Sequence, residues 1–142
     1  MEAAQAAAER APRDAEAWWL LASVSRHAGF PQASDQAFRR ASELSRRKHV
    51  PVRVSGAEFA RVVERARKAM SPDARRRLVH TRIALAALPD EVAVQGGVRP
   101  DAVSRRVREP EDVLTLYQVN LENRSASADA LQAAVVKALS KA

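Results

Sequence analysis

Few residues in this chain could bind a metal or act as nucleophiles. The sequence has no cysteine, so thiolate ligands and disulfides are excluded. Its three histidines are His27, His49 and His80. No two of them are four residues apart, the spacing that places two imidazoles on one helix face around a zinc ion. We therefore expect no metal site, and we interpret the histidines as structural or surface residues.

Other chemistries lack their residue patterns as well. The pair Gly96-Gly97 has no following lysine to complete a phosphate-binding loop. No G-x-S-x-G sequence provides a serine nucleophile. Glu109, Glu111 and Asp112 lie beside Pro110, and we interpret them as part of a solvated loop. The sequence thus predicts a protein without enzymatic activity and without a cofactor.

The net charge of +7 is unevenly distributed along the chain. Residues 39–82 contain fourteen of the 24 Lys and Arg residues but only four of the 17 Asp and Glu residues. Such a basic region can attract nucleic acid, an anionic membrane or an acidic protein. The candidate phosphate contacts form a basic patch on two predicted helices: Arg61, Arg65, Lys68, Arg75, Arg76 and Arg77.

Composition favours a helical protein outside the membrane. Hydrophobic residues make up 46% of the chain and aromatic residues only 4%, which suits an Ala, Leu and Val core between closely packed helices. The chain has no run of 18 apolar residues, and its start, Met1-Glu2-Ala3-Ala4, does not resemble a secretory signal. We expect a cytoplasmic protein.

Caps and periodicity predict the elements that position these residues. We expect helices over 2–10, from the Asp14 cap to about 28, and over 31–46. A basic linker follows at 48–54. A Ser55–Glu58 capping box then begins a helix that ends near Met70. The rest is predicted as a short helix over 71–79, strands at 81–85 and 113–117, an irregular segment over 90–112 and a helix capped by Ser127.

Residues 15–44 resemble a tetratricopeptide repeat. Trp18, Leu21 and Ala22 match the large-x-x-large-small triplet of the first helix, and the turn and second helix match at Gly29, Ser34, Phe38 and Ala41. The resemblance implies a helical hairpin whose first helix lines a groove for a partner peptide. The matching groove residues are Trp19, Ser23, Arg26 and His27, which would suit an acidic or C-terminal peptide. In the alternative interpretation, Trp19 packs against the following domain.

Residues 52–139 resemble a family of small bacterial zincin-like metallopeptidases. Three segments carry the resemblance: Val54-Ser55-Gly56-Ala57-Glu58-Phe59, Ile83 to Asp90 and Leu114 to Asn123. In that family a helix with His-Glu-x-x-His follows the last segment. Here the corresponding positions hold Ser140 for the first histidine and Lys141 for the glutamate. Because lysine repels a divalent cation, the resemblance implies the scaffold without its zinc site.

Together these features predict an α+β, mostly helical protein. A tetratricopeptide-like hairpin (1–47) would be packed on a degenerate zincin-like domain with a short sheet (55–142). We predict a non-catalytic protein–protein interaction module, acting as an adaptor, inhibitor or complex subunit. Two alternatives remain: a nucleic-acid-binding protein that uses the basic 39–82 region, and a C-terminally truncated fragment of a zinc metallopeptidase. If the final helix is incompletely covered, a homodimer would bury Leu131, Val135 and Leu139.

Overall fold

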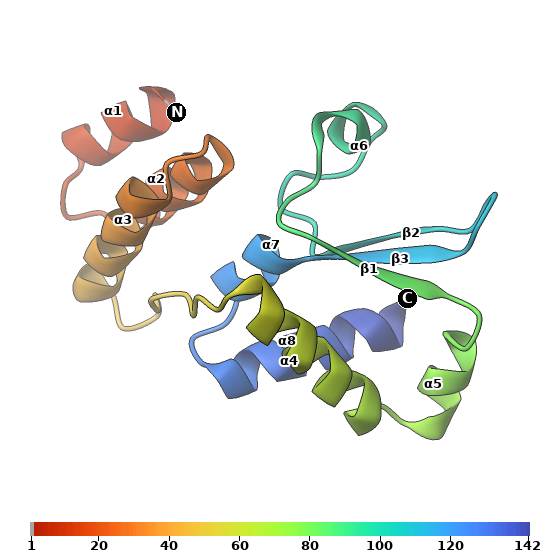
Figure 1. The fold of residues 1–142 in the computed structure, drawn as a ribbon. Helices are drawn as coiled ribbons and strands as arrows, with labels where there is room; N and C mark the ends of the chain where they lie inside the picture. Colours follow the sequence, from red (N-terminus) through yellow and green to blue (C-terminus); the bar gives the residue numbers. More distant parts are fainter. Residues whose placement is uncertain (1) are drawn as a thin grey trace. The chain divides into compact units, whose positions relative to one another are not determined.

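The structure, a computed structural model, describes residues 2–142. It has an α+β, mostly helical fold, with eight helices and three strands in the described residues (Figure 1). The chain forms two compact units, Met1–Pro51 and Val52–Ala142. Their boundary falls inside the segment 48–54 that the sequence analysis assigned to a linker. Among residues 2–142, no helix is both long and apolar enough to cross a lipid bilayer.

In residues 2–51, the first unit consists of three helices, and side-chain caps and turn residues determine where they begin and end. Its elements are α1 (Glu2–Arg10), α2 (Ala15–His27) and α3 (Pro31–Leu44), which confirms the three predicted helices. The Asp14 carboxylate accepts a hydrogen bond from the Glu16 backbone N–H at 3.0 Å and caps α2. Gly29 has φ +87°, a left-handed conformation that residues other than glycine rarely adopt. It lies in the turn between α2 and Pro31, the first residue of α3.

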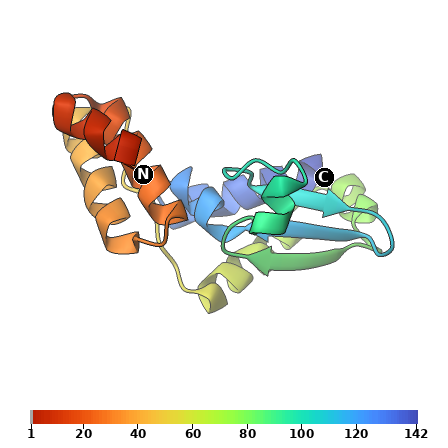
Figure 2. The same ribbon diagram turned by 90° about the horizontal axis from the view of Figure 1, so that it is seen from above.

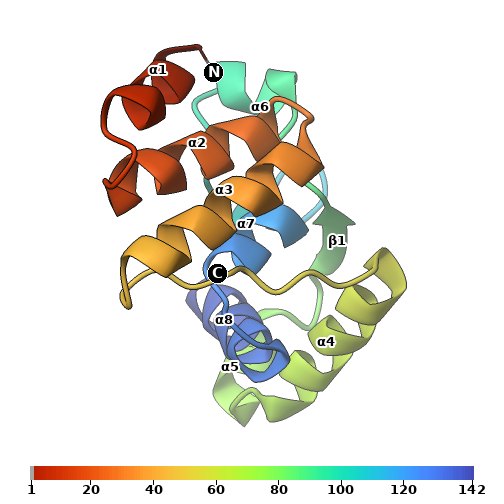
Figure 3. The ribbon, with the colours of Figure 1, turned by 90° about the vertical axis from the view of Figure 1, so that its left-hand side faces the viewer.

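Small residues let α2 and α3 approach closely (Figure 3). Ala22 and Phe38 are fully buried between the two helices. The hydroxyl of Ser34 on α3 donates to the backbone carbonyl of Ala22 on α2 at 2.6 Å. Because this buried hydroxyl is hydrogen-bonded, it adds polarity to the interface without an unpaired group. The result is an antiparallel helical hairpin with a short turn.

The second unit contains the remaining elements: α4 (Gly56–Ala69), α5 (Pro72–Arg77), β1 (Arg82–Ala86), α6 (Glu91–Gln95), β2 (Ser104–Val107), β3 (Val113–Tyr117), α7 (Gln118–Asn123) and α8 (Ala128–Lys141). The predicted serine caps are confirmed for α4 and α8. Ser55 accepts from the Glu58 N–H, and Ser127 accepts from the Ala130 N–H, each at 3.1 Å. The second arm of the predicted capping box is not formed, because the Glu58 carboxylate accepts from Arg61 instead.

The prediction that 90–112 is irregular is wrong, since this segment contains α6 and β2. The Asp90 carboxylate caps α6 by accepting from the Ala93 N–H at 2.7 Å. Strand β2 reads Ser-Arg-Arg-Val and has no apolar alternation, so its pairing with β3 defines it rather than its own sequence. Helix α7, which directly follows β3, was not predicted either.

The three strands form one mixed sheet in the order β1-β3-β2. Strand β1 runs parallel to β3, and β2 runs antiparallel to it. Within this unit, α4 and α8 lie on one face of the sheet and α6 lies on the other (Figures 1 and 2). Leu114 and Leu116 of β3 point into the helical layer and are buried. Tyr117 is also buried, and desolvation raises the pKa of its phenol.

The core of the second unit lies between the sheet and the helices. It includes Phe59 of α4, Leu116 of β3 and Leu121 of α7. The three α8 residues that we expected to be incompletely covered, Leu131, Val135 and Leu139, are at most 1% exposed and belong to this core. They are therefore unavailable to a dimer interface, and the reason given for a homodimer is wrong.

Candidate ligand-binding cleft

A cavity of about 370 Å³ opens beside α8 in the second unit. Its apolar lining comes from Val103, Leu121, Ala134 and Ala138. Three cationic side chains, those of Arg124, Lys137 and Lys141, form part of the wall. Ser104 and Ala142 complete it. We call this cavity the α8 cleft. It combines an apolar floor with positive charge, the composition of a site for an amphipathic anion.

Helix α8 presents one stripe of side chains to the cleft. Ala134 and Ala138 are four residues apart, as are Lys137 and Lys141, and the two pairs are offset by three residues, so all four lie on one face. The neighbouring stripe, which includes Leu131, is buried in the core. Helix α8 therefore contributes both to the core and to the lining of the cleft. Because alanine side chains are small, they leave room in the cleft for a ligand.

Hydrogen bonds fix the opposite wall. The Asn120 side chain of α7, only 3% exposed, donates to the backbone carbonyls of Pro100 and Ala102, both at 2.8 Å. These bonds hold the loop that leads into β2. The Arg124 guanidinium donates to the backbone carbonyl of Asp101 at 3.3 Å. The loop and the end of α7 are thereby held together at the edge of the cleft.

The three cations have no acidic partner. Lys137, Lys141 and Arg124 are all exposed. Within residues 2–142, none of them forms an ion pair with an Asp or Glu, although other cations of this unit do. Within residues 2–142, no Asp or Glu side chain pairs with these cations, so they can pair with the anionic groups of a ligand. The cleft is suited to attract carboxylate or phosphate groups.

Strand β2 lies at an edge of the sheet, so every second residue directs its backbone N–H and C=O groups away from β3. Tyr117 donates its N–H to the Val103 carbonyl at 2.9 Å, and Ser104 lies opposite Leu116 in the register. In an antiparallel ladder the hydrogen-bonded pairs alternate, so the N–H and C=O groups of Ser104 and Arg106 point outward. Ser104 also lines the cleft. A peptide main chain in the cleft can thus reach backbone donors and acceptors.

Trp19 and Ser23, two of the four predicted groove residues of α2, make contacts within the first unit. The Trp19 ring lies edge-on to Phe38 at a centroid distance of 4.8 Å and to His49 at 5.2 Å, and Lys48 lies over it at 5.1 Å. Trp19 is thus part of the packing of the first unit. The Ser23 hydroxyl donates to the Trp19 carbonyl at 3.1 Å.

The other two predicted groove residues, Arg26 and His27, are half-buried in the last turn of α2. A pocket of about 330 Å³ in this unit is lined instead by residues that the prediction did not use, among them Trp18, Leu21 and Ser25. None of the four predicted residues lines this pocket.

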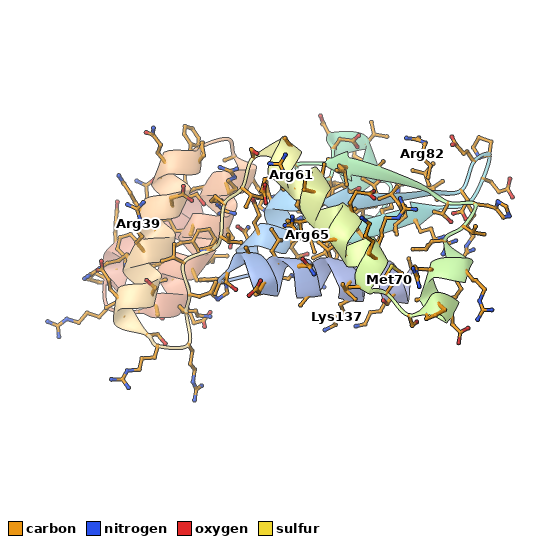
Figure 4. The ribbon with its side chains drawn as sticks, turned by 60° about the horizontal axis from the view of Figure 1, so that its bottom comes forward. Arg39, Arg61, Arg65, Met70, Arg82 and Lys137 are labelled. Atoms are coloured by element: carbon orange, nitrogen blue, oxygen red, sulfur yellow. The ribbon has the colours of Figure 1, made fainter. Side chains whose placement is uncertain are left out.

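Most of the predicted basic patch is engaged within the protein. Arg61 donates to the Glu58 carboxylate at 2.6 Å, and the pKa of Glu58 is lowered by this bond and by Arg65. Figure 4 shows Arg61 and Arg65 on α4, and Lys137 of the cleft on α8. Arg76 pairs with Asp73, and Arg77 donates to the Ser140 carbonyl at the end of α8. All six are exposed, and Lys68, Arg75 and Arg77 form no ion pair with an Asp or Glu of residues 2–142.

The cleft was not predictable from the sequence, because its wall comes from three separate segments. The signal available was the Lys137 and Lys141 pair, one helical turn apart, which we would otherwise attribute to the helix dipole. In residues 2–142, no group of three His, Cys, Asp or Glu side chains is arranged to hold a metal ion. No model of a known protein family matches the chain, and no curated protein matches it.

Proposed function

We propose that this protein is a non-catalytic protein-interaction module built on a metallopeptidase-like scaffold. The observation that carries the proposal is the charge of the α8 cleft. Lys141 occupies the position where the resembled family has its general base, and its side chain lines the cleft together with Lys137 and Arg124. Three cations in one cavity repel a divalent metal and favour an acidic ligand.

The first unit supports an adaptor role in the same proposal. Its antiparallel hairpin buries Ala22 and Ser34 at the positions where the tetratricopeptide resemblance places small residues. Hairpins of this kind commonly act as binding modules. In this proposal the partner of the second unit is an acidic protein segment, and the first unit provides a further contact surface.

Metal content and hydrolysis test the non-catalytic part of the proposal. Purified full-length protein is dialysed against zinc, washed, and measured by mass spectrometry for bound metal and with fluorogenic peptides for hydrolysis. We expect substoichiometric zinc, no chelator-sensitive cleavage, and the same thermal midpoint with zinc and with chelator, because a ligand that binds the folded state would raise the midpoint. Stoichiometric zinc together with cleavage that a chelator abolishes contradicts the proposal.

A nucleic-acid role has less support from the geometry. Arg61, Arg65, Arg76 and Arg77 are exposed but engaged with protein groups, which leaves Lys68 and Arg75 as the two cations of the patch that bind no protein group in residues 2–142. A protein that neutralises several phosphates binds with a steep salt dependence. An electrophoretic shift of single-stranded and duplex oligonucleotides at low salt distinguishes this function, and we expect no retardation.

A further inference from the structure

We infer that the α8 cleft binds an extended, acidic peptide segment, with an apolar side chain on the cleft floor and carboxylates beside Arg124, Lys137 and Lys141. This inference rests on the proposed function and specifies the chemistry of the partner. Three features of the cleft support it: unpaired positive charge, an apolar floor, and outward-facing backbone groups on one side.

The two lysines of α8 bring two positive charges to the cleft. Lys137 and Lys141 are one helical turn apart, and like charges at this spacing repel each other. Arg124 brings a third cation to the same cavity, and its one hydrogen bond to a carbonyl leaves its charge unneutralised. An anionic ligand removes this repulsion, whereas a cationic or neutral ligand leaves it in place.

The floor distinguishes a peptide from a small inorganic anion. Leu121 and Ala138 are at most 7% exposed and form an apolar base, to which Ala134 and Val103 contribute. A free phosphate gains nothing from such a base. Burial of a leucine-sized side chain there lowers the free energy of binding in proportion to the apolar area removed from water.

The edge of β2 explains why the ligand should be a peptide main chain. The outward N–H and C=O groups of Ser104 lie beside the cleft, and those of Arg106 follow two residues later along the same edge. An extended peptide forms hydrogen bonds to such an edge while its side chains alternate between the two faces. A segment that alternates apolar and acidic residues therefore matches both the edge and the cleft.

The experiment uses the full-length chain and a short fluorescein-labelled peptide of alternating leucine and glutamate, with binding measured by fluorescence anisotropy. We expect saturable binding that weakens as salt is raised, and much weaker binding of the counterpart in which glutamine replaces glutamate. The double variant Lys137→Glu, Lys141→Glu should weaken binding by roughly tenfold or more, because attraction becomes repulsion at two positions. A peptide N-methylated along one edge should also bind more weakly.

The matched control is Lys68→Glu, Arg75→Glu, which makes the same change in net charge on exposed residues outside the cleft. It should bind the peptide with the affinity of the unmodified protein. Circular dichroism melts of both variants identify any loss of fold, and in that case the neutral variant Lys137→Gln, Lys141→Gln replaces the charge reversal.

The inference is overturned by equal binding of the glutamine peptide, by equal loss in the control variant, or by binding of an oligonucleotide but not of the peptide. Absence of peptide binding in a protein that also lacks zinc and hydrolysis overturns this inference alone. Stoichiometric zinc with chelator-sensitive hydrolysis overturns the proposed function instead.

Discussion

At the scale of single residues, one charge network connects the beginning of β1 with the turn between β2 and β3. The Arg106 guanidinium donates to both carboxylate oxygens of Asp112, at 3.0 and 2.8 Å. The Thr81 hydroxyl donates to the same carboxylate at 2.8 Å. These hydrogen bonds, with that from Arg106 as the largest cause, lower the pKa of Asp112 from 3.8 to about 2. Bidentate geometry makes this pair stronger than an ordinary surface ion pair.

The lowered pKa predicts a specific pH dependence of stability. Because the folded-state pKa of Asp112 lies below its unfolded value, the contribution is complete above the unfolded value of 3.8 and is lost as the pH falls to about 2. We expect Asp112→Asn to lower the thermal midpoint at neutral pH, and we expect the difference from the unmodified protein to vanish near pH 2. Thermal melts across this range, with Asp73→Asn as the control, provide the measurement. A difference that stays constant down to the lowest pH contradicts the prediction.

A second prediction concerns a buried carboxylate. Glu122 of α7 is 2% exposed, and it accepts hydrogen bonds from the Val54 N–H at 2.9 Å, the Gln118 amide at 3.2 Å and Arg53 at 3.3 Å. Removing one partner from a buried charge pair typically costs about 3–5 kcal/mol. Glu122→Ala should therefore lower the free energy of unfolding by about that amount, whereas Glu58→Ala, which removes a solvent-screened ion pair, should cost much less. Urea unfolding of both variants measures the difference, and equal costs would refute it.

Residue-scale features differed in how well the sequence predicted them. Caps such as Asp14 and Ser127 were predictable, because their hydrogen bonds reach only two or three residues along the chain. The partners of Glu122 and Asp112 were not, because they join segments far apart in the sequence. Asp112 was assigned to a solvated acidic loop, although its charge is neutralised by Arg106 on the neighbouring strand. Trp19 was matched to a groove through the tetratricopeptide resemblance, with packing against the following domain as the alternative, and its contacts with Phe38 and His49 followed from neither.

At the scale of elements, local signals determine where helices begin. The final helix depends on Ser127, whose hydroxyl accepts from the Ala130 N–H. We predict that Ser127→Ala lowers the free energy of unfolding by about 1 kcal/mol, while Ser127→Gly costs only a few tenths of that because glycine is tolerated at the cap position. Chemical denaturation of both variants tests the difference. If alanine and glycine have the same small effect, the hydroxyl is not acting as a cap.

Of the elements that the sequence did not predict, β2 and α7 lack local signals, whereas α6 has a side-chain cap in Asp90. Strand β2 carries two consecutive arginines and takes its conformation from its ladder with β3. Helix α7 follows β3 without an intervening Gly or Pro, and no side chain caps its first turn. The sheet order β1-β3-β2 was equally hidden, since it depends on pairing between distant segments. The cleft was missed for this reason, because it requires β2 and α7 as well as α8.

At the scale of the whole molecule, the two units have separate cores. The core cluster of the second unit contains only residues from 52–142. We therefore predict that a 52–142 fragment folds alone with a cooperative urea transition, whereas a 1–51 fragment, with its core around Ala22, Ala37 and Phe38, is marginal because small chains bury less of their surface. Circular dichroism of the two fragments and of the full chain is the measurement. A 52–142 fragment that unfolds without cooperativity contradicts the prediction.

The aromatic residues are distributed so that each unit has its own intrinsic spectroscopic probe. Both tryptophans, Trp18 and Trp19, lie in α2, and the one tyrosine, Tyr117, lies at the end of β3. Fluorescence excited selectively at the two tryptophans therefore reports only the unfolding of the helical hairpin. The ultraviolet absorbance of the Tyr117 phenol reports its ionisation at the end of β3. A single unlabelled sample can thus reveal whether the two units melt in one step or in two.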